Sequence, residues 1–243
     1  MKLEILKTYD ELSRKIANLI LDTVASNPQA VLCLATGDSP LLSYQYIIKG
    51  SKERNINFSQ VQFVALDEWV GIPPTNPGSC KFYLNKNLFE PLQIPSGHIH
   101  LFDGMSSALE AECKKMDQVI KKLGGIDLMV VGVGINGHIG FNEPGVDLTL
   151  YAHVIELEEI TRIVGQKYFG EATRLTKGIT LGLQHFMEAR TAVLVANGEK
   201  KADIIKKTIE SPSSNSIPAT IIRKHGNGLV FIERGAASQL GGS

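Results

Sequence analysis

Two adjacent carboxylates, Asp67 and Glu68, follow directly after the apolar run 61–66 (VQFVAL). Neighbouring residues of an extended chain point to opposite sides, so one of the two can face a cleft while the other faces the protein. A carboxylate at the end of a strand is well placed to act as a general base. A helix cap or a solvated acidic turn is the alternative interpretation, and the pair alone leaves both open.

A histidine in the glycine-rich stretch 132–145 (GVGINGHIGFNEPG) is the second candidate for proton transfer. Histidine side chains titrate near neutral pH, and nearby amide or carboxylate groups can fix their tautomer and orientation. Asn136 and Glu143 are placed to do so for His138. The glycines that flank His138 give it little side-chain cover, which argues against a purely structural histidine. No second histidine or cysteine lies close by in the sequence, so we expect no metal site.

The same stretch contains Gly132, Gly134 and Gly137 in the GxGxxG spacing of dinucleotide-binding loops. Such a loop must open a helix directly after its strand. Instead, further residues follow that would break that helix, namely Gly140, Pro144 and Gly145. We therefore interpret the spacing as coincidental and the loop as one that presents polar groups.

The stretch 36–40 (TGDSP), which follows the apolar run 30–35, is a candidate phosphate site. Ser39 suits the N-cap of a helix, and Pro40 suits its first helical position. The free N–H groups at a helix N-terminus attract phosphate. Asp38 would oppose an anion there unless its side chain points away, and a plain capped turn is the alternative.

The elements that hold these residues in place follow from alternating patterns along the chain. Short continuous apolar runs are typical of strands buried on both faces, and they occur at 30–35, 61–66, 126–133 and 191–196. Helical patterns cover 8–26, 40–48, 108–123 and 201–209. Two further runs predict strands joined by a turn, at 217–222 and 229–232. This alternation predicts an α/β fold: a single-domain, open, mostly parallel Rossmann-like sheet with helices on both faces.

The candidate residues follow predicted strands, as ligand-binding residues do in such sheets. No linker or charge block interrupts the chain, so we expect one domain over 1–240. The last three residues, 241–243 (GGS), resemble a cloning remnant and are set aside.

Composition excludes several classes of protein. The chain has 25 basic and 25 acidic residues and no net charge, which argues against nucleic-acid and membrane partners but not against a small anionic substrate. The three cysteines show no disulfide or zinc-ligand spacing. Acidic residues within 1–22 exclude a signal peptide, and no apolar run approaches the roughly 18 residues of a membrane span. We expect a cytoplasmic protein.

Five segments together resemble one protein family: LATGDSPLLSY, VALDEWVG, VGVGINGHIGFNEPG, ITLGL and IPAT. This is the amino-sugar-6-phosphate deaminase/isomerase family, and the resemblance covers roughly 5–237. The GHIGFNEPG segment is the most specific of the motifs. The first segment and Trp69 make the chain most similar to the galactosamine-6-phosphate isomerase/deaminase branch.

The resemblance implies an enzyme that opens, isomerises and deaminates a 2-amino-2-deoxyhexose 6-phosphate (galactosamine- or glucosamine-6-phosphate), giving a ketohexose 6-phosphate and ammonia. It implies that His138 moves the ring-opening proton, oriented by Glu143 and Asn136. It further implies that Asp67 moves a proton between C2 and C1. Neither a metal nor an organic cofactor is implied. Asn136 stands where many members have aspartate, so it can hydrogen-bond His138 but brings no charge.

By the same resemblance, several positions contact the substrate and its phosphate. Lys201 matches the phosphate lysine of the family. Lys167 stands where an arginine often contacts phosphate, and it offers a point charge rather than a fork of donors. The remaining positions are Thr36, Gly37, Ser39, Glu68 and Gly137.

Two other functions stay open at this point. A 6-phosphogluconolactonase, a hydrolase of the same fold, also has a histidine in a glycine-rich loop, although the LDEWVG and FNEPG segments argue against it. A non-catalytic sugar-phosphate sensor is the third hypothesis, and the acid–base residues argue against that. In each case the partner is a small sugar phosphate, and the sequence leaves homo-oligomerisation undecided.

Overall fold

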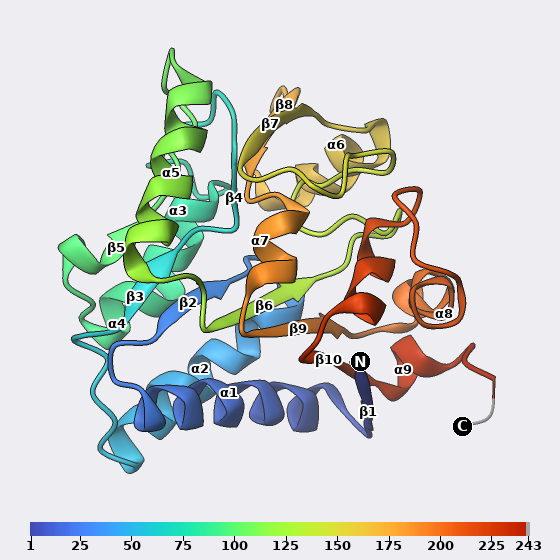
Figure 1. The fold of residues 1–243 in the computed structure, drawn as a ribbon, viewed down its shortest axis with the longest axis horizontal. Helices are drawn as coiled ribbons and strands as arrows, with labels where there is room; N and C mark the ends of the chain where they lie inside the picture. The colour runs from blue at the N-terminus through green and yellow to red at the C-terminus, as the bar shows by residue number, and fades with distance from the viewer. Residues whose placement is uncertain (242–243) are drawn as a thin grey trace.

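Seven strands form one sheet in which every neighbouring pair is parallel, in the order β1-β10-β9-β6-β2-β3-β5 (Figure 1). The computed structural model describes residues 1–241, so Gly242 and Ser243 of the suspected cloning remnant lie outside the described residues. The α/β prediction is confirmed, including a strand within each of the four apolar runs. The strands are β1 (Lys2–Leu6), β2 (Val31–Leu34), β3 (Gln62–Val64), β5 (Ile99–His100), β6 (Leu128–Gly132), β9 (Thr191–Ala196) and β10 (Gly228–Glu233).

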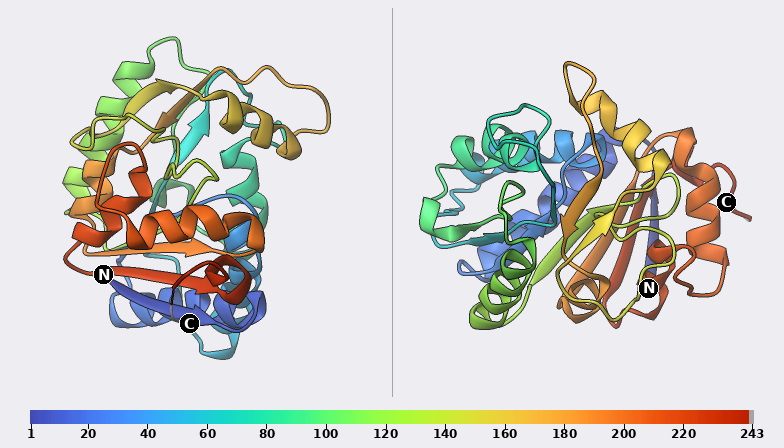
Figure 2. Two further views of the ribbon diagram at one scale, coloured as in Figure 1. Left: turned by 90° about the vertical axis from the view of Figure 1, so that its right-hand side faces the viewer. Right: turned by 90° about the horizontal axis from the view of Figure 1, so that it is seen from above.

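Helices cover both faces of this sheet, as predicted (Figures 1 and 2). Along β2, Leu32 packs into the core beneath α1 and α2, whereas Cys33 packs into the core beneath α5. Because both faces are covered, the central strands β2, β6 and β9 are almost entirely apolar. The α-helices are α1 (Tyr9–Ser26), α2 (Asp38–Glu53), α3 (Cys80–Leu84), α4 (Glu90–Leu92), α5 (Leu109–Leu123), α6 (Glu159–Gly165), α7 (Leu183–Glu188), α8 (Ala202–Glu210) and α9 (Arg234–Ala237). Within residues 1–241, none of them has the length and apolar character needed to cross a membrane.

A second sheet of three antiparallel strands, absent from the sequence prediction, lies beyond the carboxyl end of β3 (Figure 1). It pairs β8 (Lys177–Thr180) with both β4 (Asp67–Trp69) and β7 (His153–Glu156). Residues 67–69, which follow the predicted strand 61–66, therefore form a short strand of their own. A small apolar cluster around Trp69 and Phe141 supports this sheet. The sheet holds the candidate base in an extended segment rather than in a flexible loop.

Three local predictions are wrong. Residues 217–222 form a 3₁₀ helix, η5 (Pro218–Lys224), instead of a strand, because Pro218 has no N–H for a ladder and suits the first turn of a helix. The edge strand β1 was missed, since its side chains are mostly half-buried or exposed. Helix α2 begins at Asp38 with Gly37 as its N-cap, so Ser39 is inside the helix and does not cap it.

Replacing Gly178 in β8 by alanine is expected to destabilise the small sheet. A Cβ at position 178 would lie 2.3 Å from Cδ2 of Phe141, whose ring packs on Trp69 with centroids 4.5 Å apart. Overpacking of this kind costs about 1–3 kcal/mol, which urea unfolding would measure. Gly170→Ala is the control, because nothing lies within 4 Å of its added Cβ. Equal stability of the two variants would contradict this packing.

Candidate active site

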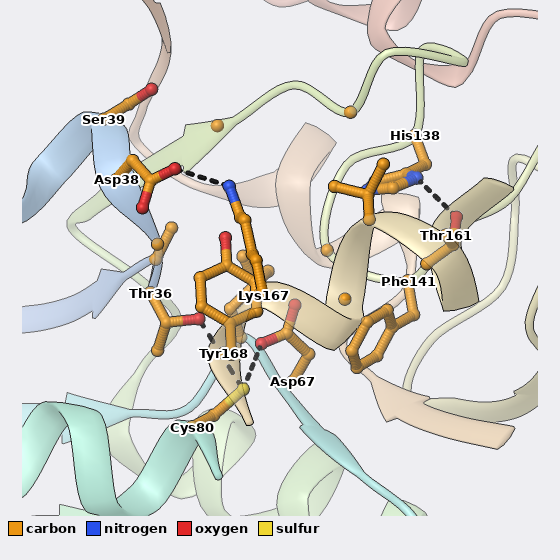
Figure 3. Close-up of a pocket in the computed structure, with 18 of the residues that line it drawn as sticks. Thr36, Asp38, Ser39, Asp67, Cys80, His138, Phe141, Thr161, Lys167 and Tyr168 are labelled. Carbon is orange, nitrogen blue, oxygen red and sulfur yellow. Dashed lines mark hydrogen bonds and ion pairs between the residues drawn. The ribbon is translucent and has the colours of Figure 1, made fainter. Parts of the chain in front are cut away.

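A cavity of about 190 Å³ opens at the carboxyl ends of β2 and β6 (Figure 3). Its wall comes from the turn after β2, from β4, from the start of α3, from the loop after β6 and from α6 with the following 3₁₀ turn η3 (Gln166–Tyr168). Most of the predicted site residues line it: Thr36, Gly37, Ser39, Asp67, Asn136, His138, Lys167 and Lys201. The lining does not include Glu68, Gly137 and Glu143.

The imidazole of His138 is held by two side chains at one end of the cavity. Its Nδ1 lies 3.3 Å from Oε2 of Glu143 and 3.2 Å from Oγ1 of Thr161 on α6. Burial by itself would raise the pKa of Glu143, but the hydrogen bond and charge of His138, with bonds from Thr161 and Asn136, hold that pKa below its ordinary value. Glu143 is therefore an ionised carboxylate that orients the histidine ring from behind the cavity wall.

Asn136 acts one step further from the histidine ring than expected. Its Oδ1 accepts a hydrogen bond from the backbone N–H of His138 at 3.3 Å, and not from the imidazole. Its Nδ2 donates to Oε2 of Glu143 and to Oε2 of Glu158, each at 2.9 Å. Asn136 thus fixes the carboxylate that fixes the ring, and it joins the β6 loop to Glu158, the residue before α6.

Close packing explains the glycines of the β6 loop, which opens no helix. A Cβ on Gly134 would lie 2.4 Å from Cε1 of His138, so the ring packs directly against this backbone. Gly140 has φ +57°, and a Cβ there would lie 2.7 Å from Oγ1 of Thr180. Gly137, expected to contact substrate, has φ +91° and packs instead against Ile217. These glycines are required by close approach and backbone conformation, not by a dinucleotide.

Asp67 and Glu68 point in opposite directions, as predicted for neighbours in an extended segment. Glu68 caps α3, because its carboxylate accepts hydrogen bonds from the backbone N–H groups of Cys80 and Lys81 at 2.9 Å. Asp67 lines the cavity with 9% of its surface exposed. Burial raises its pKa to about 7, although a hydrogen bond from Cys80 opposes the rise. The helix-cap alternative therefore holds for Glu68, which keeps Asp67 and Cys80 in fixed places.

Positive charge gathers at the other end of the cavity. Lys167 Nζ lies 2.5 Å from Oδ2 of Asp38 (Figure 3), so this carboxylate is held by a lysine. Lys201 donates a hydrogen bond to the carbonyl oxygen of Val133 at 2.6 Å. Burial, together with repulsion from Lys167, lowers the pKa of Lys201 to about 8. The start of α2 lies beside them, and its cap residue Gly37 supplies no side-chain acceptor, so the first N–H groups of the helix remain for an anion.

Among the cavity side chains that sequence reasoning did not assign to the site, two contact the proton-transfer residues. Thr161 on α6 forms a hydrogen bond with His138. The seven-residue helix α6 was not predicted, because its sequence has no strong helical periodicity. Cys80, noted for its nearby loop but with no base evident, has Asp67 as its neighbour. No local sequence signal could have paired these residues, because each contact joins separate elements. Within residues 1–241, no three His, Cys, Asp or Glu side chains gather as a metal site would require.

The raised pKa of Asp67 makes the stability of the protein depend on pH. The folded pKa of about 7 exceeds the ordinary value of 3.8, so the native state binds this proton more tightly than the unfolded state. The contribution of Asp67 to the free energy of unfolding is therefore greatest below pH 3.8, and it is lost as the pH rises through 7. We expect Asp67→Asn to be more stable than the wild type by about 2–4 kcal/mol at pH 8, with a much smaller difference near pH 4. Urea unfolding at both pH values measures this, and a difference that does not change with pH would contradict it.

Comparison with known proteins agrees with the motifs. A family model described as glucosamine-6-phosphate isomerases/6-phosphogluconolactonase matches residues 6–231. The glucosamine-6-phosphate deaminase of Thermoanaerobacter sp. (strain X514) is 38% identical over 239 residues, which are 98% of this chain and 94% of that protein. The glucosamine-6-phosphate deaminase of Lachnoclostridium phytofermentans is 41% identical over 219 residues, which are 90% of this chain and 93% of that protein.

Solved structures give the same result. One described as a monomeric glucosamine-6-phosphate deaminase superposes with a TM-score of 0.95 at 35% identity, over 98% of this chain and 99% of the other. A 6-phosphogluconolactonase from Leishmania guyanensis superposes with a TM-score of 0.80 at 16% identity, over 99% of each chain, which shows the shared fold alone. The chain therefore belongs to the glucosamine-6-phosphate isomerase/6-phosphogluconolactonase family.

Proposed function

We propose that this protein converts a 2-amino-2-deoxyhexose 6-phosphate into a ketohexose 6-phosphate and ammonia. The relatives named glucosamine-6-phosphate deaminase support this reaction. One observation carries it: Asp67, a buried carboxylate with a pKa of about 7, and His138, a histidine oriented by a carboxylate, line one cavity. The reaction needs two such groups, because protons move at different atoms of the sugar.

The steps follow from this arrangement. The phosphate binds among Lys167, Lys201 and the start of α2, which leaves the sugar between Asp67 and His138 and supplies the orientation that the reaction needs. His138 moves the ring-opening proton. Asp67 then takes the proton from C2 and returns it at C1. The oxygen at C1 gains a proton and the amine at C2 loses one, so the aldehyde becomes an alcohol and the amine becomes an imine. Water hydrolyses the imine to the ketone and releases ammonia.

A lactonase is less well supported by the same site. Opening a lactone requires one general base that activates water and no proton transfer between two carbons, so it would not need both Asp67 and His138. The likeness to the Leishmania lactonase, at 16% identity, extends to the fold alone. The position and burial of Asp67 therefore favour the isomerising deaminase.

The substrate is proposed to be glucosamine-6-phosphate, the sugar phosphate in the names of the relatives. Galactosamine-6-phosphate, its C4 epimer, is the competing substrate, favoured by the similarity of the first motif and Trp69 to that branch. The protein is proposed to work in the cytoplasm, because its three cysteines are free and buried, as is typical of a reducing compartment.

Ammonia release from both amino-sugar phosphates tests the proposal, with hydrolysis of 6-phosphogluconolactone measured in parallel. We expect release from at least one of the two, and a loss of about 10²–10⁴-fold in kcat for His138→Asn. Silence with both from folded protein would falsify the proposal. Lactone hydrolysis alone would favour the lactonase, and phosphate-ester binding without turnover would favour a sensor.

Removing the charge of Asp38 is expected to tighten substrate binding. Asp38 holds Lys167 at 2.5 Å, so it competes with the substrate's phosphate for this lysine and repels the dianion. The carboxylate is 71% exposed, and solvent screening keeps the effect modest. We expect Asp38→Asn to lower KM by about fivefold with little change in kcat.

Asp22→Asn is the matched control, because Asp22 forms an ion pair of the same length, 2.5 Å, with Arg54 on the surface and does not line the cavity. Its KM should equal that of the wild type. Inhibition by inorganic phosphate gives a second measurement, with a lower inhibition constant expected for Asp38→Asn alone. An unchanged or raised KM in Asp38→Asn would show that Asp38 does not compete with the substrate.

A further inference from the structure

The thiol of Cys80 lies in the cavity wall between two groups of the site (Figure 3). Its Sγ is 3.4 Å from Oδ1 of Asp67 and 3.6 Å from Oγ1 of Thr36. Cys80 is 5% exposed and Asp67 is 9% exposed, so solvent does little to weaken their contact. A hydrogen bond between buried groups is stronger than the same bond in water.

The position of the thiol is fixed from two directions. Cys80 is the first residue of α3, and Ser79 caps this helix by accepting a hydrogen bond from the N–H of Phe82 at 3.0 Å. The N–H of Cys80 donates to Oε1 of Glu68 at 2.9 Å. Glu68 follows Asp67 in β4, so the thiol and the carboxylate are held to the same short strand. The backbone of Cys80 is therefore anchored next to the strand that carries Asp67.

The direction of the hydrogen bond follows from the protonation of the two groups. Burial, with the negative charges of Asp67 and Glu68, raises the pKa of the Cys80 thiol well above its ordinary value. The sulfur therefore keeps its hydrogen, and an ionised carboxylate can only accept. Within residues 1–241, Cys80 is the one side chain that donates a hydrogen bond to Asp67, and Oδ2 of Asp67 receives none from a side chain.

We propose that Cys80 is a positioning residue for Asp67: its thiol holds Oδ1 and favours the ionised carboxylate, which leaves Oδ2 to exchange the proton with the sugar. This rests on the proposed function, in which Asp67 is the base. The hydrogen bond opposes the effect of burial on the pKa of Asp67. A thiol is a weak donor, so it orients the carboxylate without stabilising the anion so strongly that it loses its basicity.

The other titratable groups around Asp67 do not duplicate this role. Glu68, on the same strand, has a negative charge that raises the pKa of Asp67. Cys33 on β2 and Tyr44 on α2 are fully buried, and their raised pKa values keep them neutral. Removing the thiol hydrogen bond therefore leaves Asp67 with groups that either disfavour its charge or do not ionise.

Two substitutions at position 80 test the proposal in the full-length protein. Cys80→Ala removes the donor, and Cys80→Ser keeps a donor of similar size. In the wild type, kcat/KM should fall below about pH 7, where Asp67 becomes protonated. We expect Cys80→Ala to move this acidic limb to higher pH, lowering kcat/KM about three- to tenfold at pH 6 and less than about twofold at pH 9. Cys80→Ser keeps a donor, and the hydroxyl is the stronger one, so its limb should lie at the wild-type pH or at a lower pH.

Cys113→Ala is the control for the loss of a buried thiol, since Cys113 lies on α5 outside the cavity lining. It should leave the pH profile unchanged. An unmoved acidic limb in Cys80→Ala, or an equal loss of activity at every pH, would overturn the proposal, because the second result is what a packing role alone produces.

A second measurement does not depend on activity. Titration of the Asp67 carboxyl carbon by NMR should show a higher pKa in Cys80→Ala than in the wild type and in Cys80→Ser. If the wild type releases no ammonia from either amino sugar, the proposed function fails. This titration then still decides whether the thiol favours the ionised form of Asp67, and an equal pKa in all three proteins refutes that.

Discussion

The buried carboxylate of Glu143 is the group on which the catalytic end of the cavity depends. A buried charge is tolerated only when its hydrogen-bonding capacity is met. Here the side chains of His138 and Asn136, both in the β6 loop, contact the Glu143 carboxylate. The backbone N–H of Glu158, the residue before α6, donates a hydrogen bond to it at 3.2 Å. One anion thus joins the loop after a strand of the main sheet to the helix that closes the cavity. Losing any one of these partners would leave charge unmet and disturb the others.

Two carboxylates of the site differ because their surroundings differ. Glu143 is surrounded by donors, and its pKa is lowered. Asp67 is also buried but has a single thiol as side-chain donor within the described chain, and its pKa rises to about 7. The first carboxylate is therefore charged at neutral pH and suited to orienting a ring. The second is poised to gain and lose a proton near neutral pH.

The sequence was sufficient for the central strands β2, β3, β6 and β9 of the main sheet, because these strands are covered on both faces and are mostly apolar. It was insufficient where a segment is short or exposed, as in β1, or where a proline converts an apolar run into the helix η5. Candidate residues at strand ends, such as Asp67 and His138, were found because parallel strands end at one edge. The role of Glu68 as a helix cap was one of the alternatives that the sequence left open. The contact of Thr161 with His138 could not be predicted, because it depends on how α6 packs against the β6 loop.

The packing of the His138 ring against Gly134 has a consequence for how such a chain can diverge. The imidazole ring occupies the space that a Cβ at position 134 would need. Any other residue at this position would therefore displace the ring. Gly140 is restricted by a different neighbour, Thr180, and also by its positive φ. A substitution at one position cannot be compensated at the other. The shape of this loop is therefore set as much by the positions where a side chain has no room as by the side chains that it presents.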